Sequence, residues 1–348
     1  MRRRATIRDV ARLAGVGVST VSYVLNGYDD HVASDTREHI LAAAQQLNYR
    51  PNAIARSMVK QRTVTIGVII AELRNPLFIP ITEGVEEVLR SEGYQILVAS
   101  AYDLASEMSV IEAFRAQQVA GFIIMSLSVR YPIDHLLQLQ EENIPFVIIN
   151  RDLDDERFNQ IQLDDWRGGY AATEHLIELG HTRIGTISGL LDGEPSVRRR
   201  SAVERHRGWQ DALQEHELTV RPSWIVSGVY TYEGGYRATQ KLLDTRQPLP
   251  TALFVASDGM AVGALKAIYE AGLRLPDDIA MIAIGDPPFA AYTIPALTTM
   301  SIPIAESGRV AARILLDWIN AGKPLQPQHV ILSFHLEIRE SCGARRLA

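Results

Sequence analysis

The sequence has little of what a secreted, membrane or metal-binding protein needs. Cys342 is its only cysteine, which excludes an internal disulfide and a cysteine-rich zinc site. No apolar run approaches the roughly 20 residues of a transmembrane helix. The basic residues 1–4 are not followed by the apolar segment of a signal peptide, and low-complexity segments are absent. These absences predict a cytoplasmic protein with no membrane partner.

No group of residues has the spacing of a catalytic or metal site either. His175 and His181 are six residues apart, so they do not share a helical face, and no cysteine assists them. Ser188 and Gly189 lack the flanking glycine pattern of a hydrolase nucleophile elbow. The glycine-containing stretch 15–20 follows a helical pattern rather than a strand, unlike a dinucleotide-binding fingerprint. We therefore expect no enzyme activity, no cofactor and no bound metal.

The formal net charge of −6 conceals a strong asymmetry along the chain. Residues 1–62 contain 10 Lys+Arg against 5 Asp+Glu, a net charge of +5, and the remainder carries −11. The positive charge thus lies at one end, where a phosphate backbone could use it. With 348 residues and 47% apolar content, two or three domains with sizeable cores are expected.

The first fifty residues predict three short helices. Thr6 and Asp9 have the spacing of a capping box before an apolar pattern of helical period, and residues 15–17 interrupt it. A second helix is predicted at about 18–25 and a third at about 34–47. Two helices that meet at a tight glycine-containing turn have the layout of a helix-turn-helix. The alternative is an ordinary pair of packed helices.

From residue 64 onward, apolar runs alternate with amphipathic stretches. The predicted strands are 65–71, 95–99, 121–125, 145–149, 183–187, 252–256 and 279–284. The predicted helices between them include 81–91, 105–117, 170–179, 202–216 and 260–271. Strands that are apolar throughout and separated by helices indicate parallel sheets covered on both faces. Because about 270 residues of this pattern exceed one sheet of usual size, two doubly wound lobes are expected.

Motifs along nearly the whole chain resemble the lac repressor family of the LacI/GalR type. They are 6–11 (TIRDVA), 20–22 (TVS), 24–27 (VLNG) and 49–57 (YRPNAIARS), then 75–78 (NPLF), 169–170 (GY), 175–176 (HL), 179–181 (LGH), 258–261 (DGMA) and 295–299 (PALTT). The resemblance implies a sequence-specific transcriptional regulator, expected to be a repressor. Its expected partners are double-stranded operator DNA, a second copy of the chain and a small-molecule effector.

The same resemblance implies the domain organisation. The expected fold is an all-α helix-turn-helix headpiece at 1–50 and a hinge helix with linker at 51–62. An α/β core at 63–348 follows, with two doubly wound lobes like those of periplasmic binding proteins. We expect the N-lobe to comprise about 63–160 and 293–322, and the C-lobe about 161–292 and 323–340.

The resemblance also implies which residues contact DNA. The positions that read the major groove hold Val18, Ser19 and Tyr23. The phosphate-contacting or positioning places hold Thr6, Thr20, Ser22, Asn26, His31 and Tyr49. Tyr23 departs from the usual arginine, whose bidentate contact to guanine a tyrosine cannot make. The alternative for Val18 is that it only fills the core of the headpiece.

In the expected hinge, Asn52 and Ala55 would lie in the minor groove of the DNA. Met58 stands where the family usually wedges a leucine between base pairs, and an apolar, flexible methionine can act in the same way. The alternative is that Met58 is only a linker residue.

For the effector, the resemblance implies a site between the lobes. Its expected residues are Phe78, Asn150, Arg205, Tyr230, Asp258 and Asp286. An arginine fork and aromatic faces suit a hydroxylated ring or a planar base, and a sugar or sugar derivative is expected. The alternative for Arg205 is a solvated helix face.

Three positions depart from the family's common sugar-binding pattern. Gly285 and Asn150 stand where aspartates are frequent, and Met125 replaces a polar residue of some sugar binders. Because Gly285 removes a carboxylate, we expect Arg205 to lack an acidic partner and the site to favour a phosphorylated or acidic sugar. Inward-pointing side chains of Asp164, Asp258 or Asp286 would restore the missing charge.

Two other functions fit part of the pattern. A sugar-binding transport receptor would share the two-lobed core, but it would have an export signal and no headpiece. An enzyme with a doubly wound fold would need a phosphate loop or an acid–base pair. Operator binding that disappears when residues 1–60 are removed would distinguish a regulator from both.

Overall fold

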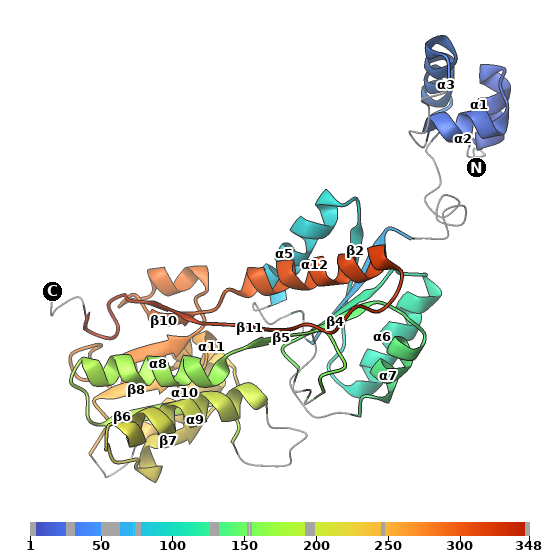
Figure 1. Ribbon diagram of the computed structural model, residues 1–348. Coiled ribbons are helices and arrows are strands. Elements are labelled where there is room, and N and C mark those ends of the chain that lie inside the picture. Colours follow the sequence, from blue (N-terminus) through green and yellow to red (C-terminus); the bar gives the residue numbers. More distant parts are fainter. Residues whose placement is uncertain are drawn as a thin grey trace. The chain divides into compact units, whose positions relative to one another are not determined.

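The computed structural model describes residues 5–25, 32–49, 63–71, 73, 78–125, 132–151, 153, 155–191, 199–244 and 248–344. The chain divides into two compact units, Met1–Val64 and Thr65–Ala348. We call them the headpiece unit and the core; both are drawn in Figure 1. The expected hinge, 51–62, lies outside the described residues.

The described part of the headpiece unit contains the three expected helices, α1 (Ile7–Ala14), α2 (Val18–Leu25) and α3 (Ser34–Gln46). The predicted capping box forms at α1. Thr6 N donates to Asp9 Oδ2 at 2.9 Å, and Asp9 N donates to Thr6 Oγ1 at 3.4 Å. Gly15 then ends α1 in the left-handed conformation, with φ 69°. The three helices enclose a small apolar core of Val10, Ala11, Val21, Val24, Ile40, Ala43 and Ala44.

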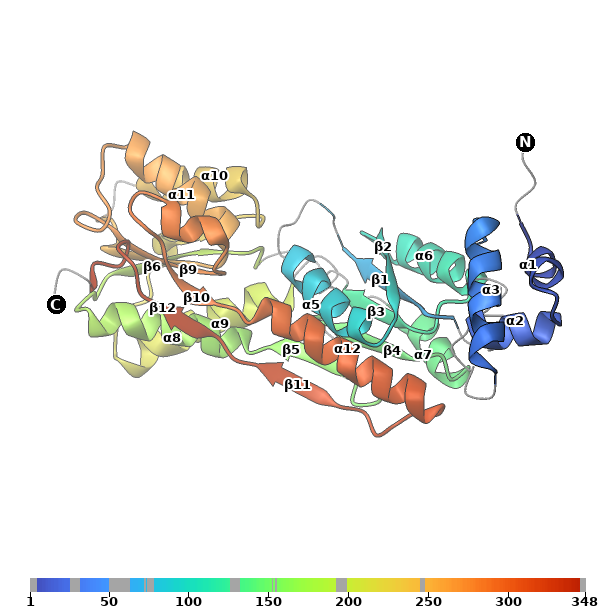
Figure 2. The same ribbon diagram turned by 90° about the horizontal axis from the view of Figure 1, so that it is seen from above.

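The first lobe of the core, the N-lobe, is built on a six-stranded sheet. Its strands are β1 (Thr65–Ile70), β2 (Gln95–Ser100), β3 (Phe122–Met125), β4 (Phe146–Ile149), β5 (Gln160–Leu163) and β11 (His329–Leu332). They are all parallel, in the order β11-β5-β4-β3-β1-β2. Helices α5 (Phe78–Ser91) and α12 (Ile304–Ala321) cover one face, and α6 (Leu104–Ala116) and α7 (Asp134–Glu141) cover the other (Figure 2). Apolar side chains of these helices pack against the sheet.

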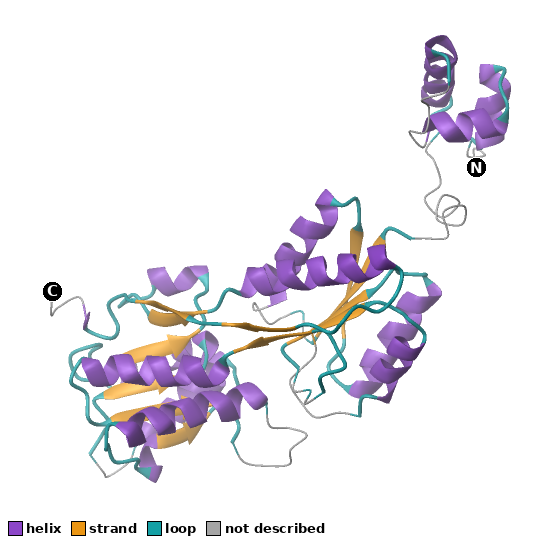
Figure 3. Cartoon of the chain, in the orientation of Figure 1, coloured by secondary structure: helices purple, strands orange, loops and turns teal. Residues whose placement is uncertain are grey.

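The second lobe, the C-lobe, repeats this arrangement. Its strands are β6 (Ile184–Ser188), β7 (Ile225–Ser227), β8 (Ala252–Val255), β9 (Ala280–Ile284), β10 (Thr298–Ser301) and β12 (His335–Glu337). Their order is β12-β10-β9-β8-β6-β7, and only β12 is antiparallel to its neighbour. Helices α8 (Asp165–Glu178) and α9 (Arg200–Glu215) cover one face, and α10 (Tyr232–Leu243) and α11 (Asp258–Glu270) cover the other (Figure 3).

The lobe boundaries differ from the expected ones at three strands. Strand β5 and strand β11 belong to the N-lobe sheet, whereas β10 belongs to the C-lobe sheet. The chain therefore passes between the lobes after β5, β10 and β11, rather than at 160, 292 and 322. These strands are short, and their sequences, QIQL, TTMS and HVIL, mix polar and apolar residues. Such a pattern does not indicate which sheet a strand joins.

Among the described helices, none is both long and apolar enough to cross a membrane.

Candidate nucleic-acid interface and effector site

Helix α2 exposes the side chains expected to read DNA. Val18 is 42% exposed and Tyr23 is 57% exposed, and Ser19 is exposed beside them. Val21 and Val24, on the other side of the helix, are buried in the apolar core. Val18 is therefore not a core residue. A helix with small or adaptable side chains on its free face suits the major groove.

The other expected DNA contacts divide into three groups. Thr6 is exposed, but its hydroxyl donates to Asp9 Oδ2 at 2.7 Å and so serves the cap of α1. Thr20, Ser22 and Tyr49 are half-buried, and Tyr49 packs against the headpiece core. Five further positions lie outside the described residues and stay predictions: Asn26, His31, Asn52, Ala55 and Met58.

In the C-lobe, the candidate effector residues lie near the carboxyl ends of parallel strands. This edge of the sheet is marked by Gly189 after β6, Ala256 after β8 and Gly285 after β9. Asp258 begins α11 at this same edge. Open α/β sheets bind ligands at the carboxyl ends of their strands, so the local topology suits a binding site.

Arg205 on α9 is buried and ion-paired, not part of a solvated helix face. Its side chain is 9% exposed, and its Nε lies 2.7 Å from Asp165 Oδ1. Its Nη1 donates to the carbonyl oxygen of Ala256 at 2.7 Å, and its Cζ lies 5.9 Å from the ring centroid of Phe334. Burial is the largest influence on the pKa of Arg205 and acts to lower it, but the charge and hydrogen bond of Asp165, with Tyr230 and Asp258, together raise that pKa.

The pairing with Asp165 corrects the expected absence of an acidic partner for Arg205. Asp165 is the first residue of α8, and sequence reasoning missed both it and Phe334. Asp164, which we had considered as a source of negative charge, instead caps α8 by accepting from Arg167 N. The expectation of an anionic effector therefore loses its physical basis.

Tyr230 lies close to Arg205 in a strained position. It adopts a positive φ of 57°, unusual for an aromatic residue. Its ring occupies the space beside Gly189, where an added Cβ would lie 2.3 Å from Tyr230 Cε2. Burial raises the pKa of the Tyr230 hydroxyl, while its contact with the Ser201 side chain acts to lower that pKa. This contact falls short of normal hydrogen-bond geometry, so a ligand hydroxyl could still act as a partner.

Asp258 takes the place that a side chain at Gly285 would fill. An added Cβ at Gly285 would lie 3.0 Å from the Asp258 carboxyl, and Gly285 has a φ of 99°. An aspartate at this position would therefore be both strained and crowded. Burial raises the pKa of Asp258, whose Oδ1 accepts from Gly259 N at 2.6 Å. A carboxylate is thus present at this edge of the sheet, although it comes from α11.

Asp286 is bound within the protein. It pairs with Arg339, with Oδ1 2.7 Å from Nη1 and Oδ2 3.1 Å from Nη2, and it accepts from Thr299 Oγ1 at 2.9 Å. These contacts join the end of β9 to β10 and the C-terminal segment. Asp286 is therefore a weak candidate for effector contact.

The N-lobe candidates lie at the corresponding edge of their own sheet. Met125 ends β3, and Asn150 follows β4 with a positive φ of 55°. Phe78 begins α5 and is 8% exposed. In the described structure, no side-chain hydrogen bond joins Asn150 to the Arg205 group, and the part of Phe78 and Asn150 in a shared site stays a prediction.

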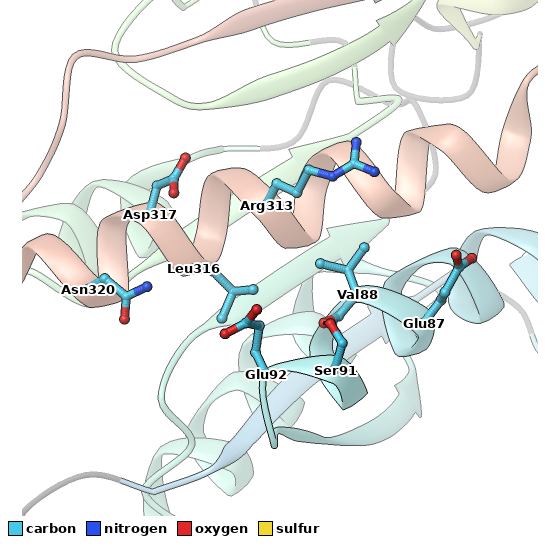
Figure 4. A pocket seen from close by; sticks show the side chains of 8 residues that line it. All are labelled: Glu87, Val88, Ser91, Glu92, Arg313, Leu316, Asp317 and Asn320. Carbon is cyan, nitrogen blue, oxygen red and sulfur yellow. The ribbon is translucent and has the colours of Figure 1, made fainter.

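A pocket of about 530 Å³ lies elsewhere in the N-lobe, between α5 and α12 (Figure 4). Its lining comes from these two helices and from Glu92, which directly follows α5: Glu87, Val88, Ser91, Glu92, Arg313, Leu316, Asp317 and Asn320. None of the expected effector residues lines it, so it is distinct from the candidate effector site.

The chain combines a helix-turn-helix unit with two doubly wound lobes that carry polar side chains at their strand ends. These features are typical of a DNA-binding regulator with a ligand-binding core. Residues 6–52 match the family "Bacterial regulatory proteins, lacI family". Residues 173–342 match the "Periplasmic binding protein-like domain".

Curated relatives extend this similarity to most of the chain. The transcriptional repressor PurR of Haemophilus influenzae (strain PittEE) is 38% identical over 324 residues, which cover 90% of this chain and 91% of the relative. The ribose operon repressor of H. influenzae (strain Rd) is 35% identical over 316 residues, covering 90% and 92%. The chain belongs to the LacI family. It is a DNA-binding transcriptional repressor with a ligand-binding core, not an enzyme or a transport receptor.

Solved structures show the same fold. The lac repressor dimer bound to operator and the anti-inducer ONPF has a TM-score of 0.85 at 28% identity, covering 98% of this chain and 99% of that one. The regulator CelR in complex with cellobiose has a TM-score of 0.72 at 33% identity, covering 97% and 100%.

Proposed function

We propose that this protein is a cytoplasmic repressor that binds a near-palindromic operator as a homodimer, through residues 1–62. A neutral sugar or sugar derivative, held between the lobes of the core, controls its operator affinity. The DNA-binding part of the proposal rests on helix α2. This helix exposes Val18, Ser19 and Tyr23, while Val21 and Val24 are buried.

The similarity to the lac repressor dimer on its operator supports the dimeric mode of binding. A two-fold dimer presents its two recognition helices to two half-sites of a palindrome. The charge of residues 1–62, +5 per chain, gives each headpiece an attraction to phosphates, while the acidic core adds none.

The charges around Arg205 support a neutral effector. Asp165 balances Arg205, and Asp258 lies close enough to influence its ionisation. Carboxylates accept hydrogen bonds from sugar hydroxyls, and the aromatic side chains of Phe78 and Tyr230 suit the apolar face of a sugar ring. The ribose operon repressor and the CelR–cellobiose complex are consistent with a sugar.

The DNA-binding part is tested by selecting preferred sites from random duplexes and measuring binding by gel shift. We expect the intact chain to bind a near-palindromic site as a dimer, and residues 65–348 to bind no DNA. A monomer on an asymmetric site, or equal binding by the core alone, would contradict the proposal.

The effector part is tested by a thermal-shift screen of neutral sugars, sugar phosphates, sugar acids and nucleosides. We expect a neutral sugar to stabilise the intact chain and to change its operator affinity. Arg205→Ala should remove the response to that sugar and leave ligand-free operator binding unchanged. Stabilisation by nucleosides or sugar phosphates alone would reject the neutral-sugar assignment.

A further inference from the structure

Helices α8 and α9 meet with their backbones in direct contact. A Cβ added at Gly169 of α8 would lie 2.1 Å from the carbonyl oxygen of Arg205. In the reverse direction, a Cβ at Gly208 of α9 would lie 2.1 Å from the carbonyl oxygen of Trp166. Only glycine allows this approach at either position. The contact fixes the start of α8 against the turn of α9 that carries Arg205.

Two hydrogen bonds between side chains of α8 and α9 strengthen this alignment. Trp166 Nε1 donates to Asp211 Oδ2 at 2.8 Å, and the Tyr170 hydroxyl donates to Glu215 Oε2 at 2.6 Å. The Asp165–Arg205 pair therefore belongs to a rigid helix pair. Both side chains are more than nine-tenths buried, with exposures of 7% and 9%.

The pair restricts what the guanidinium can offer to a ligand. Arg205 Nε donates to Asp165 Oδ1, and Nη1 donates to the carbonyl oxygen of Ala256. The ring of Phe334 lies against the guanidinium. An arginine grips a phosphate or carboxylate through two adjacent N–H groups. With Nε donating to Asp165, the fork of Nε–H and Nη2–H is closed to an anion, and one N–H of Nη1 already donates to Ala256. The remaining N–H groups of Nη1 and Nη2 can donate to ligand hydroxyls.

The pair also cancels the positive charge. Asp165 contributes one negative charge within hydrogen-bond distance, and its place in the first turn of α8 suits an anion because of the helix dipole. Asp258 adds a second carboxyl group near Arg205. The Asp165–Arg205 pair itself therefore offers a phosphate no net positive charge.

We propose that Asp165 is a specificity-determining residue of the effector site. It holds Arg205 Nε and neutralises the guanidinium, so that the site accepts neutral hydroxylated ligands and rejects phosphate-bearing ones. This inference rests on the proposed function for the location of the site.

The test uses the full chain and inorganic phosphate, with affinity measured by calorimetry in a phosphate-free buffer. Asp165→Asn keeps the shape of the side chain and removes its charge. It should strengthen phosphate binding by at least about tenfold, because a neighbouring charge shifts the pKa of an ionisable group by about 1–3 units and one unit is a tenfold change in an equilibrium constant. Asp165→Ser makes the same test with a smaller side chain, in case the first variant does not fold. Adding Arg205→Ala to either variant should abolish the gain, which separates this site from phosphate binding by the basic headpiece.

Asp164→Asn is the matched control. It removes one negative charge a single residue away, and asparagine still caps α8. We expect this control to leave phosphate affinity unchanged. No gain in the Asp165 variants, or an equal gain in the Asp164 control, would overturn the role of Asp165. Operator binding by the ligand-free wild-type chain tests the proposed function independently, so the two failures are distinguishable.

Discussion

Tyr23 is exposed on the DNA-facing side of α2, where the family commonly has an arginine. We predict that Tyr23→Arg changes the preferred base at one position of each half-site and leaves overall affinity largely intact. A bidentate arginine–guanine contact contributes about 1–3 kcal/mol of discrimination, and tyrosine offers no equivalent fork. Selection from random duplexes with both proteins measures the change. Ser22→Ala, a half-buried neighbour on the same helix, is the control and should keep the wild-type preference.

The same selected site for Tyr23→Arg and wild type would mean that Tyr23 does not read a base. A uniform loss on all sequences would instead assign it to phosphate contact.

Asp258 should make the stability of the core depend on pH. Burial raises the pKa of its carboxyl in the folded state, so folding favours the protonated form. The stability from this group is fully present below the unfolded pKa, near 3.8, and is lost as the pH rises through the higher folded pKa. We predict that Asp258→Asn raises the melting temperature at pH 7.5 and that the gain shrinks steadily toward pH 4. Melting curves of both proteins across this range measure it.

Asp164→Asn, at a half-buried helix cap, is the comparison for Asp258→Asn and should show no such gain at pH 7.5. A pH-independent difference between Asp258→Asn and wild type would show that the change acts through packing rather than ionisation.

Among the structural elements, the α8–α9 pair depends most directly on glycine. Gly169→Ala would place a Cβ 2.1 Å from the Arg205 carbonyl oxygen, so the helices must separate. We predict a loss of about 1–3 kcal/mol in the free energy of unfolding, as for other overpacked contacts. Gly259→Ala on α11 is the control, because its nearest non-local atom would be 3.8 Å away. That change should be neutral or stabilising by up to about 1 kcal/mol. Urea unfolding of both variants decides between them.

The elements predictable from sequence were those with long or fully apolar patterns. The three headpiece helices and the buried strands β1, β3, β4, β8 and β9 follow their predicted ranges closely. The sequence pattern did not identify β5, β7, β10, β11 and β12, which have three or four residues each. In β11, for example, Val330 and Leu332 pack against the core, but the exposed Ile331 is apolar as well, so the sequence does not show which face is buried.

The candidate site was predictable only where a motif marked it. Arg205, Tyr230 and Asp258 follow from the family resemblance, and they lie near one another in the C-lobe. Asp165 carries no local signal, because a charged residue at a helix start is ordinary and its partner is 40 residues away. The backbone contact at Gly169 and Gly208 brings the two together, and sequence spacing does not encode such a contact.

For the whole molecule, the separation of charge between headpiece and core leads to the last prediction. Each chain places +5 in residues 1–62 and −11 in the remainder. Operator binding should therefore depend on phosphate neutralisation by the headpieces. We expect affinity to fall about 10³-fold or more between 50 and 200 mM salt, as for proteins that neutralise several phosphates.

The slope of this salt dependence also tests the proposed dimer. Each headpiece releases its own counterions, so log K against log salt should be about twice as steep for the intact chain as for the isolated headpiece unit on one half-site. The headpiece unit has its own apolar core, which makes this comparison feasible. Binding isotherms at five salt concentrations give both slopes. Equal slopes would mean that one headpiece of the intact chain contacts DNA, which is incompatible with two-fold operator recognition.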